Sequence, residues 1–452
     1  MFAAIIAAGI LIFCFESEPE PNDLLAHYRE GTEYDTLTIH YPLDETLFPP
    51  EIVPPTFHWE DGNSKSNMWL VSIKLPDDED RLSFVCQESN WTPQKQQWET
   101  IKKRSMEREA RITILGISHR ITTRILSAGR IAFKTSKDPV GASLFYREVN
   151  LPFIDAVKDP SNIRWRFGSI SSPQQPPIIL ENLPVCGNCH SFPADGGTLA
   201  MDVDYANSKA SYVITQVAEE MTLATSDIIT WNDYRKEDGQ RTFGLLSQIS
   251  PDGRFVLSTV KDASVFVPKP DLAFSQLFFP IKGILCVYDR NAGTFAALPG
   301  ADDPQFVQSN PSWSPDGKYI VFARARAYKL KNVTGPRNVL LNPEQCKEFL
   351  KDGKLFLFDL YRIPFNGGKG GEPEPIRGAS NNGMSNFFAK YSPDGKWIVF
   401  CKAKSYMLLQ PDSELYMIPA EGGKARKLRA NTNRSVCEDF RALEFLANKY
   451  ST

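Results

Sequence analysis

The chain has 452 residues, of which 42% are hydrophobic and 23% charged, and its 51 basic and 54 acidic side chains leave a net charge of −3. This length predicts two or more domains with enough apolar material for buried cores. The near-neutral charge excludes the basic excess that binding to nucleic acid or to an acidic membrane surface requires. Two of the 8 cysteines and one of the 5 histidines stand within five consecutive positions.

Residues 2–15 form one uncharged apolar run, FAAIIAAGILIFCF, before an acidic stretch. Fourteen residues are too few for a membrane-spanning helix, which needs about twenty, but they match the apolar region of a secretory signal. We therefore expect residues 1–15 to be a signal or lipoprotein segment, lipidated at Cys14 in the second case, with an uncleaved anchor as the alternative. Residues 16–35 follow as an acidic linker. The prediction is an exported, periplasmic or envelope-associated protein that contacts a membrane only through this N-terminal segment.

Short segments rich in β-branched and aromatic residues follow, and turn clusters separate them. Their spacing is typical of all-β sandwiches, so residues 36–155 are predicted to form an immunoglobulin- or fibronectin-like β-sandwich. One short surface helix is expected inside this region, where a Thr-Pro pair precedes Trp98 and Ile101. Residues 156–184 end in a Pro-rich stretch and are predicted to be an extended linker.

A repeat occupies residues 185–430. Each copy has a turn with Asp and Gly, followed by an apolar strand, and three copies continue into a strand, a Gly-containing hairpin turn and another strand. Four strands per unit are typical of a β-propeller blade. We therefore predict an all-β protein in which a propeller with SPDG-type repeats follows the sandwich, and a helical tail over residues 431–452. The four turn phrases are ADGGTLAM from Ala194, SPDGRFVLS from Ser250, SPDGKYIVF from Ser314 and SPDGKWIVF from Ser392.

The phrase SPDGK, with the later LYRIPFNGG and LYMIPAEGG, resembles the TolB-type, WD-repeat-like propeller proteins of the bacterial envelope. The resemblance covers roughly residues 185–430. It implies a propeller architecture but gives little information about function, because some propellers are binding proteins and others are enzymes. Four turn signals are fewer than such propellers usually have, so a small propeller, degenerate blades and a truncated product all stay open.

Immediately before the first repeat stands Cys186-Gly187-Asn188-Cys189-His190, the C-x-x-C-H pattern of covalent haem attachment. Cys186 and Cys189 would each bond a vinyl group of the porphyrin, and His190 would be the proximal iron ligand. Zinc would need further ligands, and the sequence has no second C-x-x-C and no H-x-x-x-H. A redox dithiol would need a helix start in a βαβ unit, which a Pro-rich linker and β-repeats do not offer. Haem c is the predicted cofactor, and a plain disulfide or dithiol is the alternative.

The sixth iron position has three candidates. Met201 lies eleven residues after His190, but the sister copies hold Phe at this repeat position, which favours a blade core residue. Met384, in the loop before the last repeat, is the second candidate, and an open site is the third. The histidines of the sandwich region are expected to be ordinary strand or turn residues: His40, His58 and His119.

The other motifs in the sequence give weaker evidence for a functional site. Asp202, Asp204 and Asn207 have oxygen spacing similar to that of a Ca²⁺ loop but lack its Gly and its bidentate Glu, so a turn is expected. The Gly-rich stretch around residues 369–371 reads as a hairpin tip. The strand cysteines Cys286 and Cys401 are expected to be buried thiols.

Three functions follow from these patterns, and one of them, an oxidoreductase acting on a small molecule at an open haem site, has no residue-level support beyond the haem motif. The other two belong to different classes. The first is an exported mono-haem c-type cytochrome in which the propeller holds haem for electron transfer or for redox-linked binding of a protein partner. The second is a TolB-like envelope binding or docking protein with a protein or glycan ligand, without haem, in which Cys186 and Cys189 form a disulfide. In both cases we expect an electron-transfer or binding protein rather than a catalyst, and no nucleic-acid partner.

Overall fold

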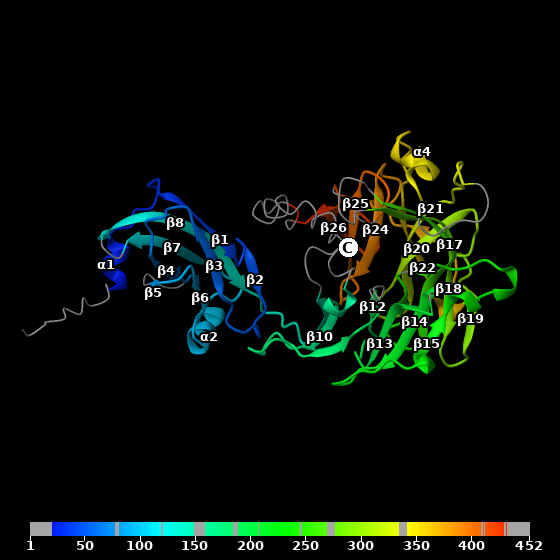
Figure 1. Ribbon diagram of the computed structural model, residues 1–452, viewed down its shortest axis with the longest axis horizontal. Coiled ribbons are helices and arrows are strands. Elements are labelled where there is room, and N and C mark those ends of the chain that lie inside the picture. Colours follow the sequence, from blue (N-terminus) through cyan, green and yellow to red (C-terminus); the bar gives the residue numbers. More distant parts are fainter. Residues whose placement is uncertain are drawn as a thin grey trace, which may run out of the picture. The chain divides into compact units, whose positions relative to one another are not determined.

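The chain separates into two compact units, one built from residues 1–143 and 169–175 and the other from residues 144–168 and 176–452. Both units consist mainly of strands (Figure 1). No helix in the described part of the chain is long and apolar enough to cross a membrane. The computed structural model describes residues 20–76, 81–118, 121–148, 159–183, 189–206, 208–244, 246–268, 276–333, 341–407, 410, 412–428 and 431.

The first unit is a β-sandwich. One layer has the strand order β5-β4-β7-β8, with β2 also on β8, and the other layer has the order β1-β3-β6. The layers meet where β1 pairs with β8 in parallel. The strands are β1 (Asp35–Tyr41), β2 (Thr46–Phe48), β3 (Phe57–Asp61), β4 (Met68–Lys74), β5 (Arg81–Cys86), β6 (Asn90–Trp91), β7 (Ala110–Ser118) and β8 (Ile121–Thr135).

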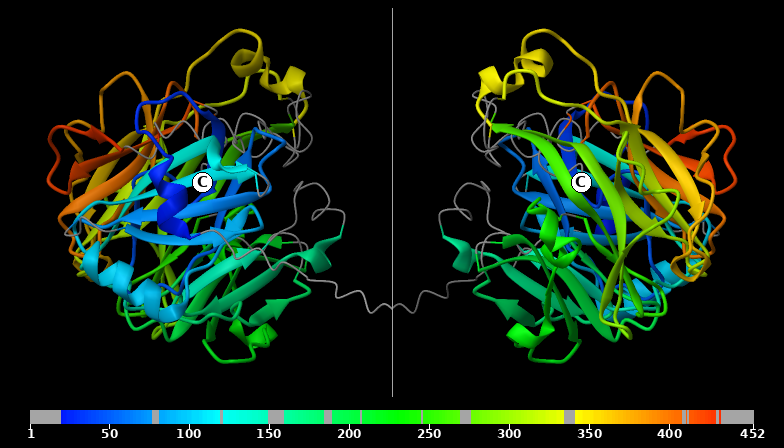
Figure 2. Two further views of the ribbon diagram at one scale, coloured as in Figure 1. Left: turned by 90° about the vertical axis from the view of Figure 1, so that its left-hand side faces the viewer. Right: turned by 90° about the vertical axis from the view of Figure 1, so that its right-hand side faces the viewer.

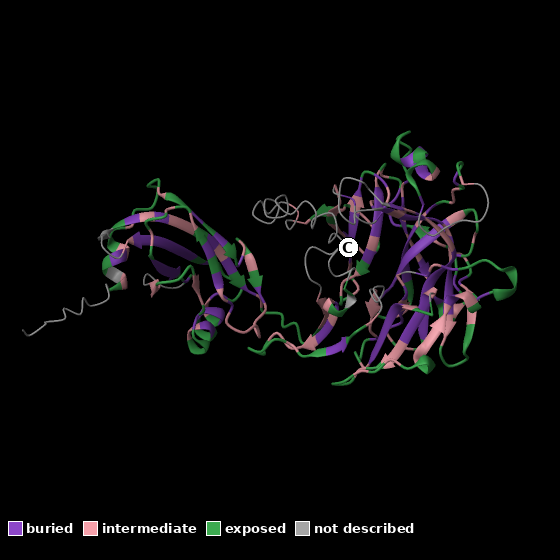
Figure 3. Ribbon diagram, viewed as in Figure 1, coloured by how far each residue is buried: buried purple, intermediate pink, exposed green. Residues whose placement is uncertain are grey.

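The sandwich core combines apolar side chains of both layers with one helix. The expected helix is present as α2 (Lys95–Arg104), and Trp98 and Ile101 on its inner face are fully buried. Its N-terminal cap is Gln94, whose backbone N–H bonds the Gln97 side chain at 2.9 Å, so Thr92 does not cap it. A second short helix, α1 (Pro21–Ala26), also belongs to this unit. Buried and exposed residues alternate along β3, whereas β4 is buried almost throughout (Figure 3).

The second unit opens with a three-stranded sheet of order β11-β10-β9. Two of these strands lie within residues 156–184, so this stretch is not simply a linker. Trp165 of β10 is fully buried against the core of the next sheet, while the Pro-rich part lies between β10 and β11. The strand expected to end the sandwich, β9, also belongs here. The strands are β9 (Leu144–Glu148), β10 (Arg164–Gly168) and β11 (Ile178–Glu181).

Four blades follow, and each is an antiparallel sheet of four strands (Figures 1 and 2). One parallel bridge between β18 and β20 joins the second and third blades. The predicted fold class, an all-β sandwich followed by a propeller with SPDG-type repeats, is confirmed. The first blade has β12 (His190–Ser191), β13 (Thr198–Tyr205), β14 (Ser208–Gln216) and β15 (Ile228–Thr230), and the second has β16 (Gln248–Ile249), β17 (Phe255–Pro268), β18 (Gln276–Asp289) and β19 (Thr294–Ala297). The third has β20 (Phe306–Trp313), β21 (Tyr319–Arg326), β22 (Asp359–Pro364) and β23 (Glu374–Pro375), and the fourth has β24 (Ser385–Tyr391), β25 (Trp397–Ala403), β26 (Glu414–Pro419) and β27 (Arg426–Lys427).

The SPDG phrase forms the same hydrogen-bonded turn in the last three blades. In the third blade Ser314 Oγ accepts the N–H of Tyr319 at 2.9 Å and donates to Asp316 Oδ1 at 2.7 Å. The same carboxylate oxygen accepts the N–H of Lys318 at 3.1 Å. The second and fourth blades repeat these three bonds. The first blade has Pro193 in place of the serine, so it lacks the hydroxyl that ties the turn to its strand.

Candidate ligand-binding site

The first strands of three blades bring three polar side chains together. Cys189 stands just before β12, Gln248 lies in β16, and Lys390 lies in β24. Lys390 Nζ donates to Gln248 Oε1 at 2.7 Å. The Cys189 thiol lies close enough to Lys390 for each group to affect the pKa of the other. We name these three residues the inner-strand cluster.

A repeated backbone feature positions this cluster. Leu246, Asn310 and Phe388 each lie six residues before the turn aspartate of their blade, and all have positive φ, at 68°, 53° and 52°. Such values are uncommon for residues other than glycine, and a bulge of this kind changes the direction in which the following side chains point. The β24 ladder shifts its register just before Lys390. Cys189 holds the corresponding position in the first blade.

Asp202 of β13 lies across from Cys189, because its N–H bonds the Cys189 carbonyl at 3.0 Å in continuation of the β12–β13 ladder. Its carboxylate is buried and accepts three hydrogen bonds from the second blade: Leu246 N at 2.9 Å, Ser247 N at 3.1 Å and Ser247 Oγ at 2.7 Å. Burial raises the pKa of Asp202 to about 7, and these bonds oppose the shift. Asp202 therefore ties the first blade to the second.

Cys189 is not an activated thiol. Burial, and secondarily the charge of Asp202, raises its pKa to about 12. Reactive cysteines have lowered pKa values, since the thiolate is the nucleophile and the metal ligand. Cys189 therefore contributes a neutral, polarisable wall to the cluster.

Lys390 is the charged residue of the cluster. Its side chain is exposed by surface area, yet protein crowds the ammonium, and this desolvation lowers its pKa from 10.5 to about 8. Within the described residues its hydrogen-bond partner is the neutral Gln248, and no carboxylate forms an ion pair with it. A solvent-contacting lysine of this kind can bind an anion or exchange a proton near neutral pH.

His190 points to the other side of the sheet from Cys189. Its ring packs against Phe145 at 4.7 Å and Phe192 at 6.0 Å between centroids. The next residue, Ser191, bonds the Tyr212 hydroxyl at 3.2 Å on the side of Cys189. This alternation is what strand geometry requires of consecutive residues.

The predicted distal ligand, Met201, pairs directly with His190 across β12 and β13. Paired residues of antiparallel strands project from the same face of a sheet, so these two side chains cannot approach one iron from opposite sides. Met201 is fully buried in an apolar core, as expected for a core residue of the blade. Met384 is half-buried in the loop before β24, where its N–H bonds Asn382 Oδ1 at 3.1 Å.

The arrangement of Cys189 and His190 does not fit one porphyrin. A haem bonded to the Cys189 sulfur and ligated by His190 needs both side chains on one side of the chain, whereas the structure directs them to opposite faces of the sheet. Cys186 lies outside the described residues. Haem attachment would therefore require residues 189–191 to leave the place they occupy in β12.

The remaining sequence candidates are dispersed. Asp204 bonds Lys209 at 3.1 Å near the β13–β14 turn, and Asn207 lies outside the described residues. His40 and His58 lie in β1 and β3 of the sandwich, while His119 is also outside the described part. Within the described residues no group of three or more His, Cys, Asp or Glu side chains could hold a metal ion.

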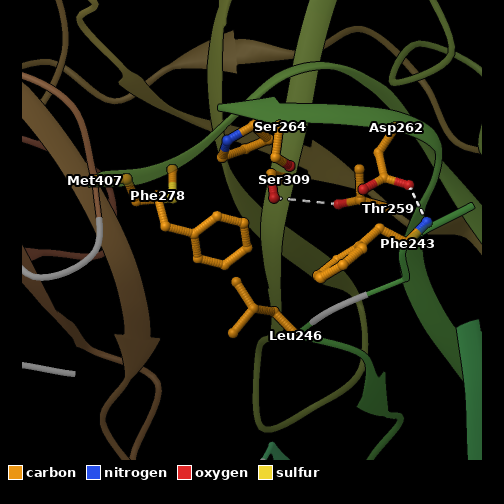
Figure 4. A pocket seen from close by; sticks show the side chains of 9 residues that line it. Phe243, Leu246, Thr259, Asp262, Ser264, Phe278, Ser309 and Met407 are labelled. Atoms are coloured by element: carbon orange, nitrogen blue, oxygen red, sulfur yellow. Dashed lines mark hydrogen bonds between the residues drawn. The ribbon is translucent and has the colours of Figure 1, made fainter. Parts of the chain in front are cut away.

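A pocket beside β17 and β18 was not foreseen from the sequence (Figure 4). Its cavity volume is about 20 Å³, which is room for about one water molecule. Phe243, Leu246 and Phe278 form one side, and hydroxyl groups with a carboxylate form the other (Figure 4). Leu246 also donates its N–H to Asp202, so the pocket adjoins the hydrogen bonds that join the first blade to the second. We name it the β17–β18 pocket, and its polar side consists of Thr259, Asp262, Ser264 and Ser309.

Comparison with known proteins found distant similarity to solved structures only. No family model matches the chain, and no curated protein matches it. Similar solved structures include an oligogalacturonate lyase from Vibrio parahaemolyticus, with 13% identity, TM-score 0.33 and coverage of 63% of this chain and 59% of that one. A hydrazine synthase from Kuenenia stuttgartiensis has 14% identity, TM-score 0.36 and coverage of 87% and 80%. A periplasmic gluconolactonase from Pseudomonas aeruginosa has 12% identity, TM-score 0.34 and coverage of 80% and 95%. The chain thus spans less than two thirds of the lyase.

The predicted function is wrong in both of its forms. The cytochrome prediction requires Cys189 and His190 to serve one haem, and they point apart. The docking alternative requires a Cys186–Cys189 disulfide, and Cys189 is a free thiol. Covalent haem as such stays a prediction, because Cys186 lies outside the described residues.

Proposed function

We propose that this protein binds a small anionic molecule at the inner-strand cluster, and that Lys390 is the group that recognises its charge. One observation carries the proposal: Lys390 contacts solvent and, among the described residues, bonds only a neutral amide. An ammonium without a carboxylate partner is incompletely compensated, and an anionic ligand would compensate it.

The surroundings of Lys390 favour an anion. Arg147 of β9 also acts on Cys189 with a positive charge. Burial raises the pKa of Asp202, whose N–H bonds the Cys189 carbonyl, to about 7 and so reduces its negative charge near neutral pH. Gln248 Nε2 donates one N–H to Ser247 O at 3.0 Å, and its second N–H can serve a ligand while Oε1 holds Lys390. The cluster is therefore cationic below neutral pH.

The protonation of Lys390 sets a pH limit on binding. Its pKa of about 8 means that the ammonium is complete below pH 7 and is lost as the pH rises through 8. We expect the affinity for an anion to fall over this range and to fall with added salt.

Calorimetric titration of the full chain with acetate, citrate and inorganic phosphate tests the proposal. We expect at least one of the three to bind at one site, and Lys390→Met to weaken that binding at least tenfold. Lys396→Met is the matched control, because Lys396 is an exposed lysine of the same blade beside Asp394. Binding of none of the three anions, or equal binding by Lys390→Met and wild type, would contradict the proposal.

Export stays part of the proposal. It is supported by the apolar run at residues 2–15, which lies outside the described residues. The TolB-type resemblance likewise supports a shared propeller architecture rather than a shared partner.

A further inference from the structure

A larger cavity lies between the second and third blades, beside their SPDG turns. Its volume is about 440 Å³, which is within the roughly 300–1,000 Å³ of pockets that bind small molecules. The two turns adjoin each other, because a Cβ placed on Gly317 would lie 3.9 Å from Pro251 Cδ. We name this cavity the turn pocket, and the side chains that line it include Asp252, Phe255, Trp313, Asp316 and Phe365.

Three aromatic rings form the apolar part of the turn pocket. Phe365 meets the other two edge to face, with its ring centroid 4.9 Å from that of Phe255 and 4.6 Å from that of Trp313. Trp313 is held further by its indole Nε1, which donates to Gln248 O at 3.2 Å. All three rings belong to the apolar core shared by the second and third blades. The apolar wall is therefore formed before any ligand arrives, which lowers the cost of binding.

The charged side chains that line the turn pocket, within the described residues, are two carboxylates. Asp252 and Asp316 are both exposed, and the hydrogen bond from the Ser314 hydroxyl lowers the pKa of Asp316, so this carboxylate is ionised at neutral pH. Lys318 Nζ lies 3.3 Å from Asp316 Oδ2, but both side chains are exposed, and ion pairs of this kind are weak. The pocket thus presents negative charge beside aromatic rings.

Each turn uses one oxygen of its carboxylate. Asp252 Oδ1 accepts the N–H of Arg254 at 3.0 Å, and Asp316 Oδ1 accepts the N–H of Lys318 at 3.1 Å, each in addition to the hydroxyl of the turn serine. A primary ammonium has three N–H donors and would find few free acceptors here. An alkylated ammonium needs negative charge and apolar contact rather than acceptors, and aromatic rings attract it.

We infer that the turn pocket binds a small alkylated ammonium compound, with its charge toward the two carboxylates and its alkyl groups against the three rings. One of these rings already contacts a cation, because the guanidinium carbon of Arg254 lies 4.6 Å from the ring centroid of Phe255. The inference is independent of the proposed anion site, since Lys390 is not among the described residues that line the turn pocket.

Calorimetric titration of the full chain with choline and with 3,3-dimethyl-1-butanol, its uncharged analogue of the same shape, tests the inference. We expect choline to bind at one site, about tenfold more tightly than the alcohol. Asp252→Asn combined with Asp316→Asn keeps both Oδ1 acceptors and should weaken choline binding about tenfold. Asp394→Asn makes the same change at the turn of the fourth blade, outside the residues that line the pocket, and should bind choline as the wild type does.

Absence of choline binding, or binding no tighter than that of the alcohol, would overturn the inference. This comparison needs no variant, so it decides the matter even if thermal unfolding shows that the double variant is unfolded. Equal weakening by Asp394→Asn and by the double variant would also overturn the inference. Lys390→Met should leave choline binding unchanged, so the anion site and the turn pocket can each fail without the other.

Discussion

The first blade and the second blade make the same inter-blade contact with different chemistry. Asp202 and Thr259 each lie seven residues after the turn aspartate of their blade. Thr259 bonds the next blade with a neutral hydroxyl, to Gln308 O at 3.2 Å, whereas Asp202 does so with a buried carboxylate. The first blade also lacks the serine of the SPDG turn. The second blade is thus joined to the next by a neutral group, whereas the first blade uses a titratable group beside the candidate site. Departures from a repeat pattern are expected at functional sites.

The pH dependence of stability should show the largest difference between these two blades. The pKa of Asp202 in the folded chain is about 7, above its ordinary value of 3.8. Its contribution to stability is therefore fully present below pH 4 and is lost as the pH rises through 7. The three-unit difference corresponds to about 4 kcal/mol. Asp202→Asn should remove this dependence in urea unfolding followed from pH 4 to pH 8.

Asp195→Asn, an exposed turn position in the same blade, is the control for that series and should retain the wild-type dependence. An Asp202→Asn variant whose stability falls with pH as steeply as that of the wild type would show that another group is responsible.

Removal of the Asp202 carboxylate and removal of the Thr259 hydroxyl should lower the free energy of unfolding by different amounts. Asp202→Ala leaves the N–H groups of Leu246 and Ser247 without this acceptor, whereas Ser247 Oγ can still donate to Ser258 Oγ at 2.9 Å. We therefore expect the free energy of unfolding to fall by about 3 kcal/mol at pH 5. Thr259→Ala removes one neutral donor and should cost about 1 kcal/mol. Urea denaturation of both variants measures the difference. Equal losses of unfolding free energy would mean that the Asp202 carboxylate stabilises the contact between blades no more than the Thr259 hydroxyl does.

The turn serine, present only in the SPDG blades, should have the smallest effect. Ser314→Ala removes one bond to Tyr319 N and one to Asp316, at a partly exposed turn, and we expect a loss of about 1 kcal/mol. Ser314→Thr keeps the hydroxyl and should recover most of that loss. A Thr variant as unstable as the Ala variant would indicate that packing, rather than these bonds, stabilises the turn.

Much of the fold could be predicted because local sequence patterns indicate its strands and turns. Turn aspartates and glycines followed by apolar strands define the blades, and alternating apolar residues define the sandwich. The strands β10 and β11 were missed because their Pro-rich flank resembles a linker, and Trp165 is buried only through a partner sheet distant in sequence. Such long-range pairing leaves no local signal.

The candidate site was less predictable for the same reason. Cys189 was singled out by its motif, but its neighbours Gln248 and Lys390 come from blades 59 and 201 residues further along, counted as 248 − 189 and 390 − 189. The C-x-x-C-H pattern indicated haem from spacing alone. The β12 strand, however, alternates side chains across a sheet and separates the two residues that the pattern joins. A repeat alignment would have placed Lys390 beside Gln248, since both lie four residues before their turn aspartates.

The most direct test of the account is the titration of Lys390 itself. NMR of the chain carrying ¹³C-methylated lysines, with the Lys390 signal assigned by its absence in Lys390→Arg, reports the pKa of this one ammonium. We predict a pKa of about 8 in the free protein and an upward shift when an anion such as citrate is added. A pKa at the ordinary value of 10.5, unchanged by the anion, would contradict the central claim that Lys390 is a desolvated charge awaiting an anionic ligand.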